Sequence, residues 1–378
     1  MNRSTSLRAR ARRFGCVAVL LAACGDGPTG RSAPDLVLST AGRAERGSVL
    51  ELAVTEGGAA VPPGEIRWTV EPAGAAELVG ANRLRLREAG TVTLRAAYDD
   101  RTAQIQVAVS IPPSIVFDWR ALFESSDVYR VALDGRDLVR LTQHGSYDFD
   151  PTVAGGSLVF VSTRDGNYEL YSVPLAGGVE QRLTQTAENE ITPALSPGGT
   201  RLLFGRGTPS TPSTLFLARA DAASPEPLAP SLGVTGAKTE ANGAWSPTGD
   251  RVAFMSSGGG NPDVYLWTGA GTPTRVVAGD AYDGDPAWSP DGTRIVFVTA
   301  RHGDLELYML TLASGQLTRL THSPAADYFP TWLPDGRIVY VVNTGDTRRL
   351  FWLDPQRPAE THEIPLPAGE AGNPAALP

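Results

Sequence analysis

The sequence predicts an all-β protein, with a six-bladed β-propeller preceded by a small β-sandwich. The first observation is a repeat with a period of 42 to 50 residues over the C-terminal two thirds of the chain. The second is a high turn content, 41 Gly and 30 Pro, with no sustained 3.6-residue apolar period beyond the N-terminus. At 378 residues, 42% hydrophobic and 20% charged, the chain has the composition of a globular protein large enough for two domains.

The repeat unit is clearest in GDPAWSPDGTRIVF, residues 284–297, which runs from a proline through a tryptophan and a tight turn to an apolar triplet. Each triplet ends in an aromatic residue, a second aromatic follows eleven or twelve residues later, and many units close on Leu-Thr. Four short strands per period are typical of a propeller blade, which buries its faces against its neighbours. The equivalent opening positions are Pro151, Pro193, Gly243, Pro286, Pro330 and Pro374.

The turn and the tryptophan of each unit have local explanations. In SPDG, residues 289–292, proline presets φ, aspartate bonds back to the backbone and glycine takes a positive φ, so the sequence favours a tight hairpin. We interpret Trp245, Trp288 and Trp332 as packing between blades.

The two ends of the repeat region predict how the ring closes. The first unit begins at Ser114 without a proline-led strand, and the chain ends with such a strand and no blade after it. We therefore expect residues 373–377 to pair with the strand around Ile115 as the innermost strand of the first blade, which removes two open edges from the propeller of residues 114–378.

The N-terminus is expected to direct export. Residues 1–23 contain five arginines, no acid and a short apolar run, which is typical of a signal peptide. The sequence Leu-Ala-Ala-Cys ending at Cys24 resembles the bacterial lipobox, which implies lipidation of Cys24; an ordinary signal peptide cut near Ala23 is the alternative. Residues 24–32 would form a tether. Loss of the leader changes the formal net charge from −8 to −13, which argues against a nucleic-acid partner.

Residues 33–110 lack the repeat and contain short alternating segments spaced as in a small sandwich, with Trp68 as the expected core aromatic. Their pattern resembles a bacterial Ig-like domain of group 2. Residues 111–113, Ile-Pro-Pro, would be the hinge to the propeller.

The repeat itself resembles the TolB-type (WD40-like, PD40) propeller repeat. This resemblance implies a cell-envelope protein that docks a protein or peptide partner at the mouth of the propeller channel. TolB has an α/β N-terminal domain where this chain has the Ig-like pattern, so membership of the Tol–Pal system is not implied. We expect a monomeric outer-membrane lipoprotein facing the periplasm or the cell surface, in contact with the membrane only through its lipid.

The sequence shows no catalytic signature. It contains no GxSxG motif and no helical histidine pair with a glutamate, and its four histidines lie in separate repeats. We therefore expect no enzyme activity and no cofactor. The alternatives are a carbohydrate-binding or carbohydrate-active propeller that uses acids in its central pocket, and a non-catalytic scaffold.

One set of polar residues recurs with the repeat. An acid stands three residues before five of the opening positions, and rotational symmetry would place these acids as a ring at a channel mouth, with tyrosines nearby. Such a ring would suit a basic ligand or Ca²⁺, the latter at Asp148, Asp283 and Asp327. The alternative is that the acids are structural and accept hydrogen bonds from the neighbouring blade. The predicted mouth residues are Asp148, Glu190, Glu240, Asp283, Asp327, Tyr147, Tyr282 and Tyr328.

Overall fold

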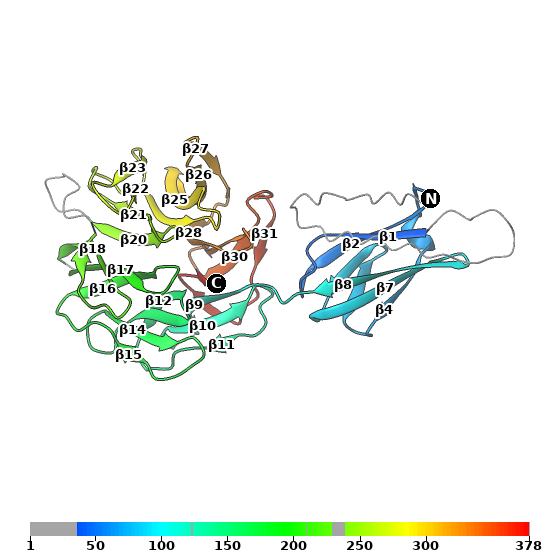
Figure 1. Cartoon of the computed structure of the whole chain (residues 1–378), viewed down its shortest axis with the longest axis horizontal. Coiled ribbons are helices and arrows are strands. Elements are labelled where there is room, and N and C mark those ends of the chain that lie inside the picture. The colour runs from blue at the N-terminus through cyan, green and yellow to red at the C-terminus, as the bar shows by residue number, and fades with distance from the viewer. Residues whose placement is uncertain (1–35, 122–123, 209, 229–238, 378) are drawn as a thin grey trace, which may run out of the picture. The chain divides into compact units, whose positions relative to one another are not determined.

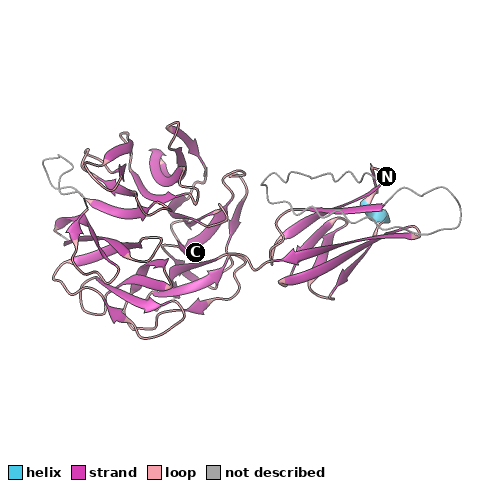
Figure 2. Cartoon of the chain, viewed as in Figure 1, coloured by secondary structure: helices cyan, strands magenta, loops and turns pink. Residues whose placement is uncertain are grey.

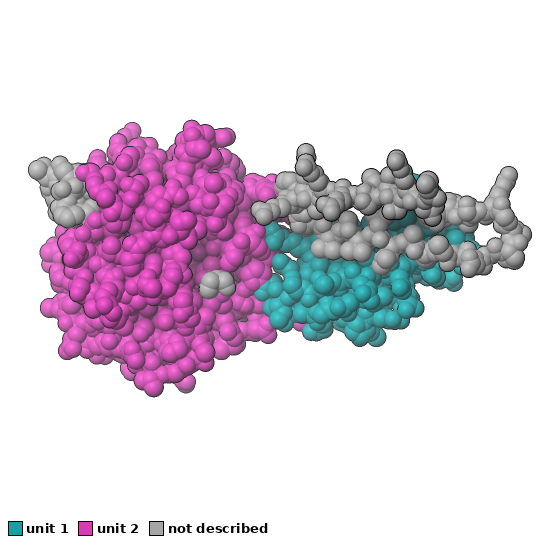
Figure 3. Space-filling view, viewed as in Figure 1, with its two compact units in different colours: residues 1–112 teal, residues 113–378 magenta. Residues whose placement is uncertain are grey.

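The computed structural model describes residues 36–121, 124–208, 210–228 and 239–377. Within them the chain consists of strands, turns and a single 3-10 helix, η1 (Pro63–Glu65), as Figure 2 shows. It divides into two compact units, Met1–Pro112 and Pro113–Pro378 (Figure 3). The predicted leader, Cys24 and the tether lie outside the described residues. No described helix has the length and apolar character needed to cross a membrane.

The first unit is a sandwich of two antiparallel sheets around one core. The alternation along β8, where every second residue from Ala103 to Val109 is buried, gives one face to that core and the other to solvent. Trp68 packs against the core from its edge. One sheet has the order β1-β2-β6-β5 with β3 beside β2, and the other β4-β7-β8. The strands are β1 (Leu36–Ala41), β2 (Val49–Glu56), β3 (Ala59–Ala60), β4 (Arg67–Glu71), β5 (Ala76–Gly80), β6 (Arg83–Leu86), β7 (Gly90–Tyr98) and β8 (Arg101–Val109).

The second unit contains six antiparallel sheets among its described residues, which we number as blades in chain order (Figure 1). Each inner strand contacts the inner strand of the next blade, so the six sheets form a closed ring. The all-β prediction is confirmed, and the described residues of this unit form six sheets, as many as the predicted blades. Blade 1 combines β9 (Ser114–Ala121), β10 (Asp127–Ala132) and β11 (Val139–Arg140) with β32 (Gly369–Ala371) and β33 (Ala375–Ala376).

The other five blades each have four strands in chain order, from the inner strand outward. Blade 2 is β12 (Asp148–Ala154), β13 (Ser157–Ser162), β14 (Glu169–Pro174) and β15 (Gln181–Arg182), and blade 3 is β16 (Asn189–Leu195), β17 (Arg201–Thr208), β18 (Thr211–Arg219) and β19 (Glu226–Pro227). Blade 4 is β20 (Glu240–Trp245), β21 (Val252–Ser256), β22 (Asp263–Trp267) and β23 (Thr274–Val277). Blade 5 is β24 (Asp283–Trp288), β25 (Arg294–His302), β26 (Asp304–Thr311) and β27 (Gln316–Arg319), and blade 6 is β28 (Ala326–Trp332), β29 (Ile338–Asn343), β30 (Arg348–Leu353) and β31 (Thr361–Glu363).

The repeated turn and tryptophan join one blade to the next. The SPDG turn closes with a bond from the Gly292 N–H to the Ser289 carbonyl (2.9 Å), and Gly292 has φ +67°. The buried indole of Trp288 donates to the Ala244 carbonyl of blade 4 (3.1 Å) and carries the Arg251 guanidinium 4.6 Å above its ring. The tryptophan prediction is therefore correct at this interface.

The C-terminal segment supplies the inner edge of blade 1. Gly369–Ala371 pairs with Trp119–Ala121, and Ala375 and Ala376 pair with Val116 and Ile115. The paired segment is longer than the predicted 373–377 and is split. Between its two halves the Gly372 N–H donates to the Asp118 carbonyl (2.8 Å), at the place where the other inner strands also bulge.

Candidate binding site at the channel mouth

The five recurring acids are buried at the start of their inner strands. Asp148, Glu190 and Asp283 are 0% exposed, and Glu240 and Asp327 are 1% exposed. They therefore do not offer their carboxylates to a ligand in an open mouth, and that interpretation of the sequence is wrong. The reason for three of them is that an arginine of the same blade covers the carboxylate.

Three of these acids are neutralised by arginines of their own blade. The Arg164 Nη2 lies 3.1 Å from both carboxylate oxygens of Asp148. In blade 5 the Arg301 Nη2 donates to Asp283 (2.9 Å). In both blades the arginine Nε also donates to a hydroxyl two residues earlier, Ser162 (2.7 Å) in blade 2, which fixes the guanidinium over the acid.

In blade 3 the arginine that neutralises the acid stands at a different position of the second strand. Arg206 lies directly opposite Glu190 in the β16–β17 pairing, and its Nε donates to the glutamate Oε1 (2.8 Å). Burial raises the pKa of Glu190, and the bonds from Thr186 and Arg206 oppose that rise.

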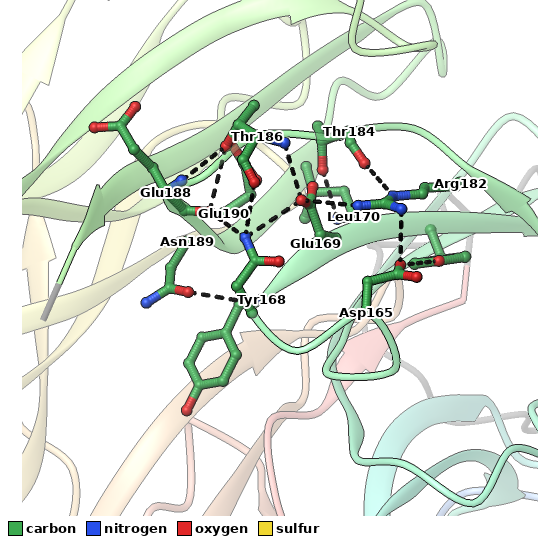
Figure 4. Close-up of polar contacts among 12 residues, drawn as sticks. Asp165, Tyr168, Glu169, Leu170, Arg182, Thr184, Thr186, Glu188, Asn189 and Glu190 are labelled. Carbon is green, nitrogen blue, oxygen red and sulfur yellow. Dashed lines mark hydrogen bonds and ion pairs between the residues drawn. The ribbon is translucent and has the colours of Figure 1, made fainter.

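A second acid stands at the start of the third strand in four blades, where it anchors the fourth strand. Glu169 accepts from Arg182 (3.1 Å) and from the Thr186 N–H (2.9 Å), and the Thr186 hydroxyl donates to Glu190 (2.9 Å), as Figure 4 shows. The Thr184 hydroxyl accepts from the Leu170 N–H (2.8 Å), which explains the recurring Leu-Thr. The acid and arginine pairs are Asp127 with Arg140, Glu169 with Arg182, Asp263 with Arg275, and Glu306 with Arg319.

The calcium site expected at Asp148, Asp283 and Asp327 does not form in this arrangement. The three carboxylates lie at separate blade interfaces, and arginines occupy two of them. Among the residues that the structure describes, no group of three or more His, Cys, Asp or Glu side chains is placed to hold a metal ion.

In blades 2 to 6 the residue before the opening position, which is Gly243 in blade 4 and proline in the others, lies on the inner edge of the ring. Asp150, Thr192, Asn242, Asp285 and Phe329 all have φ between +47° and +52°, and each lies at a register shift of its inner strand. The positive φ turns these residues toward their counterparts in the next blade. The Asn242 N–H donates to the Thr192 hydroxyl (3.4 Å), and Asp150 accepts from the Thr192 N–H. These bonds link consecutive blades around the axis.

Three carboxylates of this inner edge have raised pKa values. Burial raises the pKa of Asp118 to about 8, and the neighbouring Asp150 carboxylate adds to the rise. Burial likewise raises the pKa values of Asp150 and Asp285 to about 6. Burial at this inner edge therefore disfavours the charged form of all three carboxylates.

A pocket of about 430 Å³ opens beside Asp118, where blade 1 is closed by the C-terminal segment. Its aromatic lining is Tyr147, Phe149, Tyr168 and Phe329. Phe149 and Tyr168 pack edge to face with ring centroids 5.4 Å apart.

The charged lining of this pocket comes from blades 1 and 6. Arg120 donates to Glu370 (2.5 Å), and the exposed Arg348 lies close enough to Asp118 to lower its pKa. A second pocket of about 570 Å³ adjoins the first and shares Arg120, Tyr147 and Glu370 with it. We call the two together the mouth pocket.

The three predicted tyrosines do not lie at one site in the structure. Tyr147 is 49% exposed and lines the mouth pocket. Tyr282 and Tyr328 are half-buried and pack against the cores of blades 5 and 6, and burial raises the pKa of Tyr282. Only Tyr147 of the eight predicted mouth residues therefore lies in the mouth pocket.

Sequence reasoning missed most of the mouth pocket. Arg120, Arg348 and Glu370 occupy positions that do not recur in the other repeats, so the period gave no signal for them. Asp150 and Asp285 each precede an opening proline of the repeat, so the sequence pattern could have identified them. No feature of the sequence pointed to Asp118.

Comparison with known proteins agrees with this fold. Residues 234–354 match the family described as the TolB beta propeller domain (PD40). A TolB homolog of Chlorobium luteolum is 36% identical over 126 residues, which are 33% of this chain and 27% of that protein. The chain thus spans only about a quarter of the length of the curated relatives that it matches.

Two solved structures share the fold at low identity. TolB from Acinetobacter baumannii aligns with a TM-score of 0.63 and 15% identity over 82% of each chain. A putative TolB from Agrobacterium tumefaciens aligns with a TM-score of 0.55 and 19% identity over 69% of this chain and 91% of that chain. The PD40 match thus shows that residues 234–354 are similar to the TolB beta propeller domain, and the six sheets and the two solved structures show a β-propeller fold for residues 114–378.

Proposed function

We propose that this protein is a non-catalytic envelope protein that binds a protein or peptide partner in the mouth pocket. The observation that carries the proposal is the exposure of Tyr147 and Tyr168, 49% and 40%, on the wall of a pocket that also holds two arginines. Exposed tyrosine and arginine side chains around a depression are the residue types that dominate binding at protein interfaces.

The TolB-type propeller supports the same role, because the curated relatives are TolB homologs. Their match covers only part of their length, so the partner of this protein is proposed from the pocket alone. The mouth pocket presents Arg348 without an ion-pair partner among the described residues, and it therefore favours a partner segment that carries a carboxylate and an aromatic or aliphatic side chain.

The lipobox-like sequence supports attachment to the membrane through Cys24. Mass spectrometry of the mature N-terminus measures this directly. A diacylglyceryl-modified Cys24 is the expected result, and Cys24→Ala should release the protein from the membrane fraction. An unmodified N-terminus near residue 24 would contradict the anchor without affecting the binding proposal.

Site-specific photocrosslinking in the native cell tests the binding proposal. A benzoylphenylalanine at Tyr147 should give one discrete protein adduct. The control is the same residue at Val179, which is 81% exposed in the loop between β14 and β15 and takes no part in the pocket. Identical adducts from both positions, or an adduct with glycan at Tyr147 and none with protein, would contradict the proposal.

A further inference from the structure

Blade 4 lacks an arginine beside its inner-strand acid, but there Glu240 accepts from the Leu215 N–H (3.3 Å). Among the described residues, blade 6 lacks both a donor of this kind and the arginine found in blades 2, 3 and 5. In those blades a guanidinium lies over the stacked aromatic pair of the second and third strands and neutralises the inner-strand acid. Arg164 lies 4.2 Å from the Tyr171 ring centroid in blade 2 and Arg301 5.0 Å from that of Tyr308 in blade 5. In blade 3, Arg206 lies 4.8 Å from the centroid of Phe216.

Blade 6 retains the acid and the aromatic pair in the same register. Asp327 pairs with Val342, as Glu190 pairs with Arg206 in blade 3. Tyr340 and Phe351 pair across β29 and β30, with ring centroids 6.2 Å apart at 40°.

The aromatic pair of blade 5, Phe297 and Tyr308, has nearly the same geometry, 6.2 Å and 44°. Blade 6 therefore has an intact aromatic platform. The residue four positions after its first aromatic, which is arginine in blades 2 and 5, is Thr344.

A pocket of about 510 Å³ lies where the arginine would be. Asp327, Tyr340, Val342 and Phe351 line it, together with His322 from the loop before β28. This pocket, which we call the blade-6 pocket, is bounded by the same kinds of group that surround Arg164 in blade 2.

The carboxylate of Asp327 is left without a partner. The residue is 1% exposed, and neither of its carboxylate oxygens has a hydrogen bond in the part of the chain that the structure describes. The nearby Thr321 hydroxyl opposes the rise in the pKa of Asp327, but it donates to Glu306 and accepts from the Leu307 N–H, so it does not replace the missing cation. A buried carboxylate with no donor is unfavourable, which makes this group a strong acceptor for any cation that can enter.

We propose that the blade-6 pocket binds a guanidinium group from outside the chain, which Asp327 holds by an ion pair while Tyr340 and Phe351 contact its face. A guanidinium suits the pocket better than an ammonium because it is planar, weakly hydrated and able to stack on an aromatic ring. It also suits the pocket better than a metal ion, since a single carboxylate among aromatic walls offers too few oxygen ligands. The proposal is independent of the mouth pocket, with which the blade-6 pocket shares no lining residue.

Calorimetric titration of the full mature chain at pH 8 with N-acetyl-arginine methylamide tests the proposal. Saturable binding at one site is expected, with the uncharged isostere N-acetyl-citrulline methylamide at least about tenfold weaker. Asp327→Asn should weaken the arginine probe by at least about tenfold. Asp304→Asn, which removes an exposed carboxylate of blade 5, is the matched control and should leave binding unchanged.

A second variant fills the pocket from within. Val342→Arg places an arginine at the position of Arg206 in blade 3, so it should raise the melting temperature and abolish binding of the probe. Val342→Gln, which has a long side chain but no charge, should do neither. Because Val342→Arg is expected to be more stable than the parent protein, misfolding cannot account for its loss of binding.

Two probes distinguish the source of the guanidinium. Binding of the blocked arginine assigns the pocket to an arginine side chain of a partner, and binding of agmatine alone assigns it to a free guanidinium compound. Either result supports the proposal. Absence of binding by both, or equal binding by the parent protein and Asp327→Asn, would overturn it.

Discussion

The interfaces formed by blade 2 and by blade 6 begin with the same acid in the same register, and they differ in what meets it. Asp148 is held by Arg164, whose side chain is 11% exposed and lies over an aromatic pair. Asp327 faces a comparable aromatic pair across the blade-6 pocket and has no arginine beside it among the described residues. The difference shows that the same acid of the repeat can be covered by an arginine at one interface and line a pocket at another.

The comparison also separates an acid with an arginine partner from one without. Position in the repeat is identical for the two acids, so position alone does not decide their role. What decides it is one nearby side chain, an arginine in blade 2 and Val342 or Thr344 in blade 6. Four predictions test this difference.

The largest effect is expected from removing a whole strand rather than a side chain. Deleting residues 369–378 removes β32 and β33 from blade 1 and exposes the β9 edge. We expect the melting temperature to fall by roughly 10 °C or more, because several kcal/mol of pairing and burial are lost. A truncated chain that melts like the full chain in calorimetry would mean that the ring does not depend on its closure.

The next largest change in stability is expected in blade 2, where Arg164 covers Asp148. Arg164→Met leaves Asp148 buried without its cation, which should cost about 3 kcal/mol in the free energy of unfolding by urea. The double variant with Asp148→Asn should recover part of that loss, since no buried charge then remains. As a control, Arg219→Met breaks an exposed pair with Asp221 and should change stability by less than about 0.5 kcal/mol. Equal losses of stability in Arg164→Met and Arg219→Met would show that Arg164 does not neutralise a buried charge.

A smaller change in stability, of opposite sign, is expected at Asp327 in the blade-6 pocket. Burial raises the pKa of Asp327 to about 7, and Glu306 adds to the rise. The folded protein therefore binds a proton more tightly than the unfolded chain, so this residue lowers stability as the pH rises from about 4 to about 7. Asp327→Asn removes that loss and should stabilise the protein by roughly 1 to 3 kcal/mol at pH 8.

The measurement for this variant is urea unfolding at pH 5 and pH 8. The parent protein and Asp327→Asn should differ less at pH 5 than at pH 8. A variant that loses stability equally at both pH values would show that the Asp327 carboxylate already has a partner in solution.

The smallest effect on stability is expected at the mouth pocket. Tyr147 is half exposed, so Tyr147→Ala should change the free energy of unfolding by no more than about 0.5 kcal/mol. The same change should reduce crosslinking or capture of the envelope partner several-fold. A large loss of stability would show that Tyr147 serves the fold, as Arg164 does, and is not a binding residue.

Much of the fold was predictable because the repeat makes the same local demands in each blade. The opening proline, the tight turn and the aromatic pair recur at fixed spacing, so the strands and the all-β class followed from periodicity. The buried tryptophans Trp245, Trp288 and Trp332 were predicted for the same reason.

The candidate sites were much less predictable. The recurring acids were recognised, but their burial was not, because the arginines that cover them lie on the neighbouring strand at two different positions, as Arg164 and Arg206 show. The mouth pocket was largely missed because Arg120, Arg348 and Glu370 come together only where blades 1 and 6 meet.

The sequence by itself determined the repeating unit, its strands and the number of blades, since these depend on side-chain alternation and turn chemistry within about 45 residues. Only the tertiary structure decided which acids are neutralised and which pockets remain. Those outcomes depend on the side chains that adjacent strands and successive blades bring together, and a single residue, such as valine in place of arginine opposite the acid, changes a closed interface into a pocket.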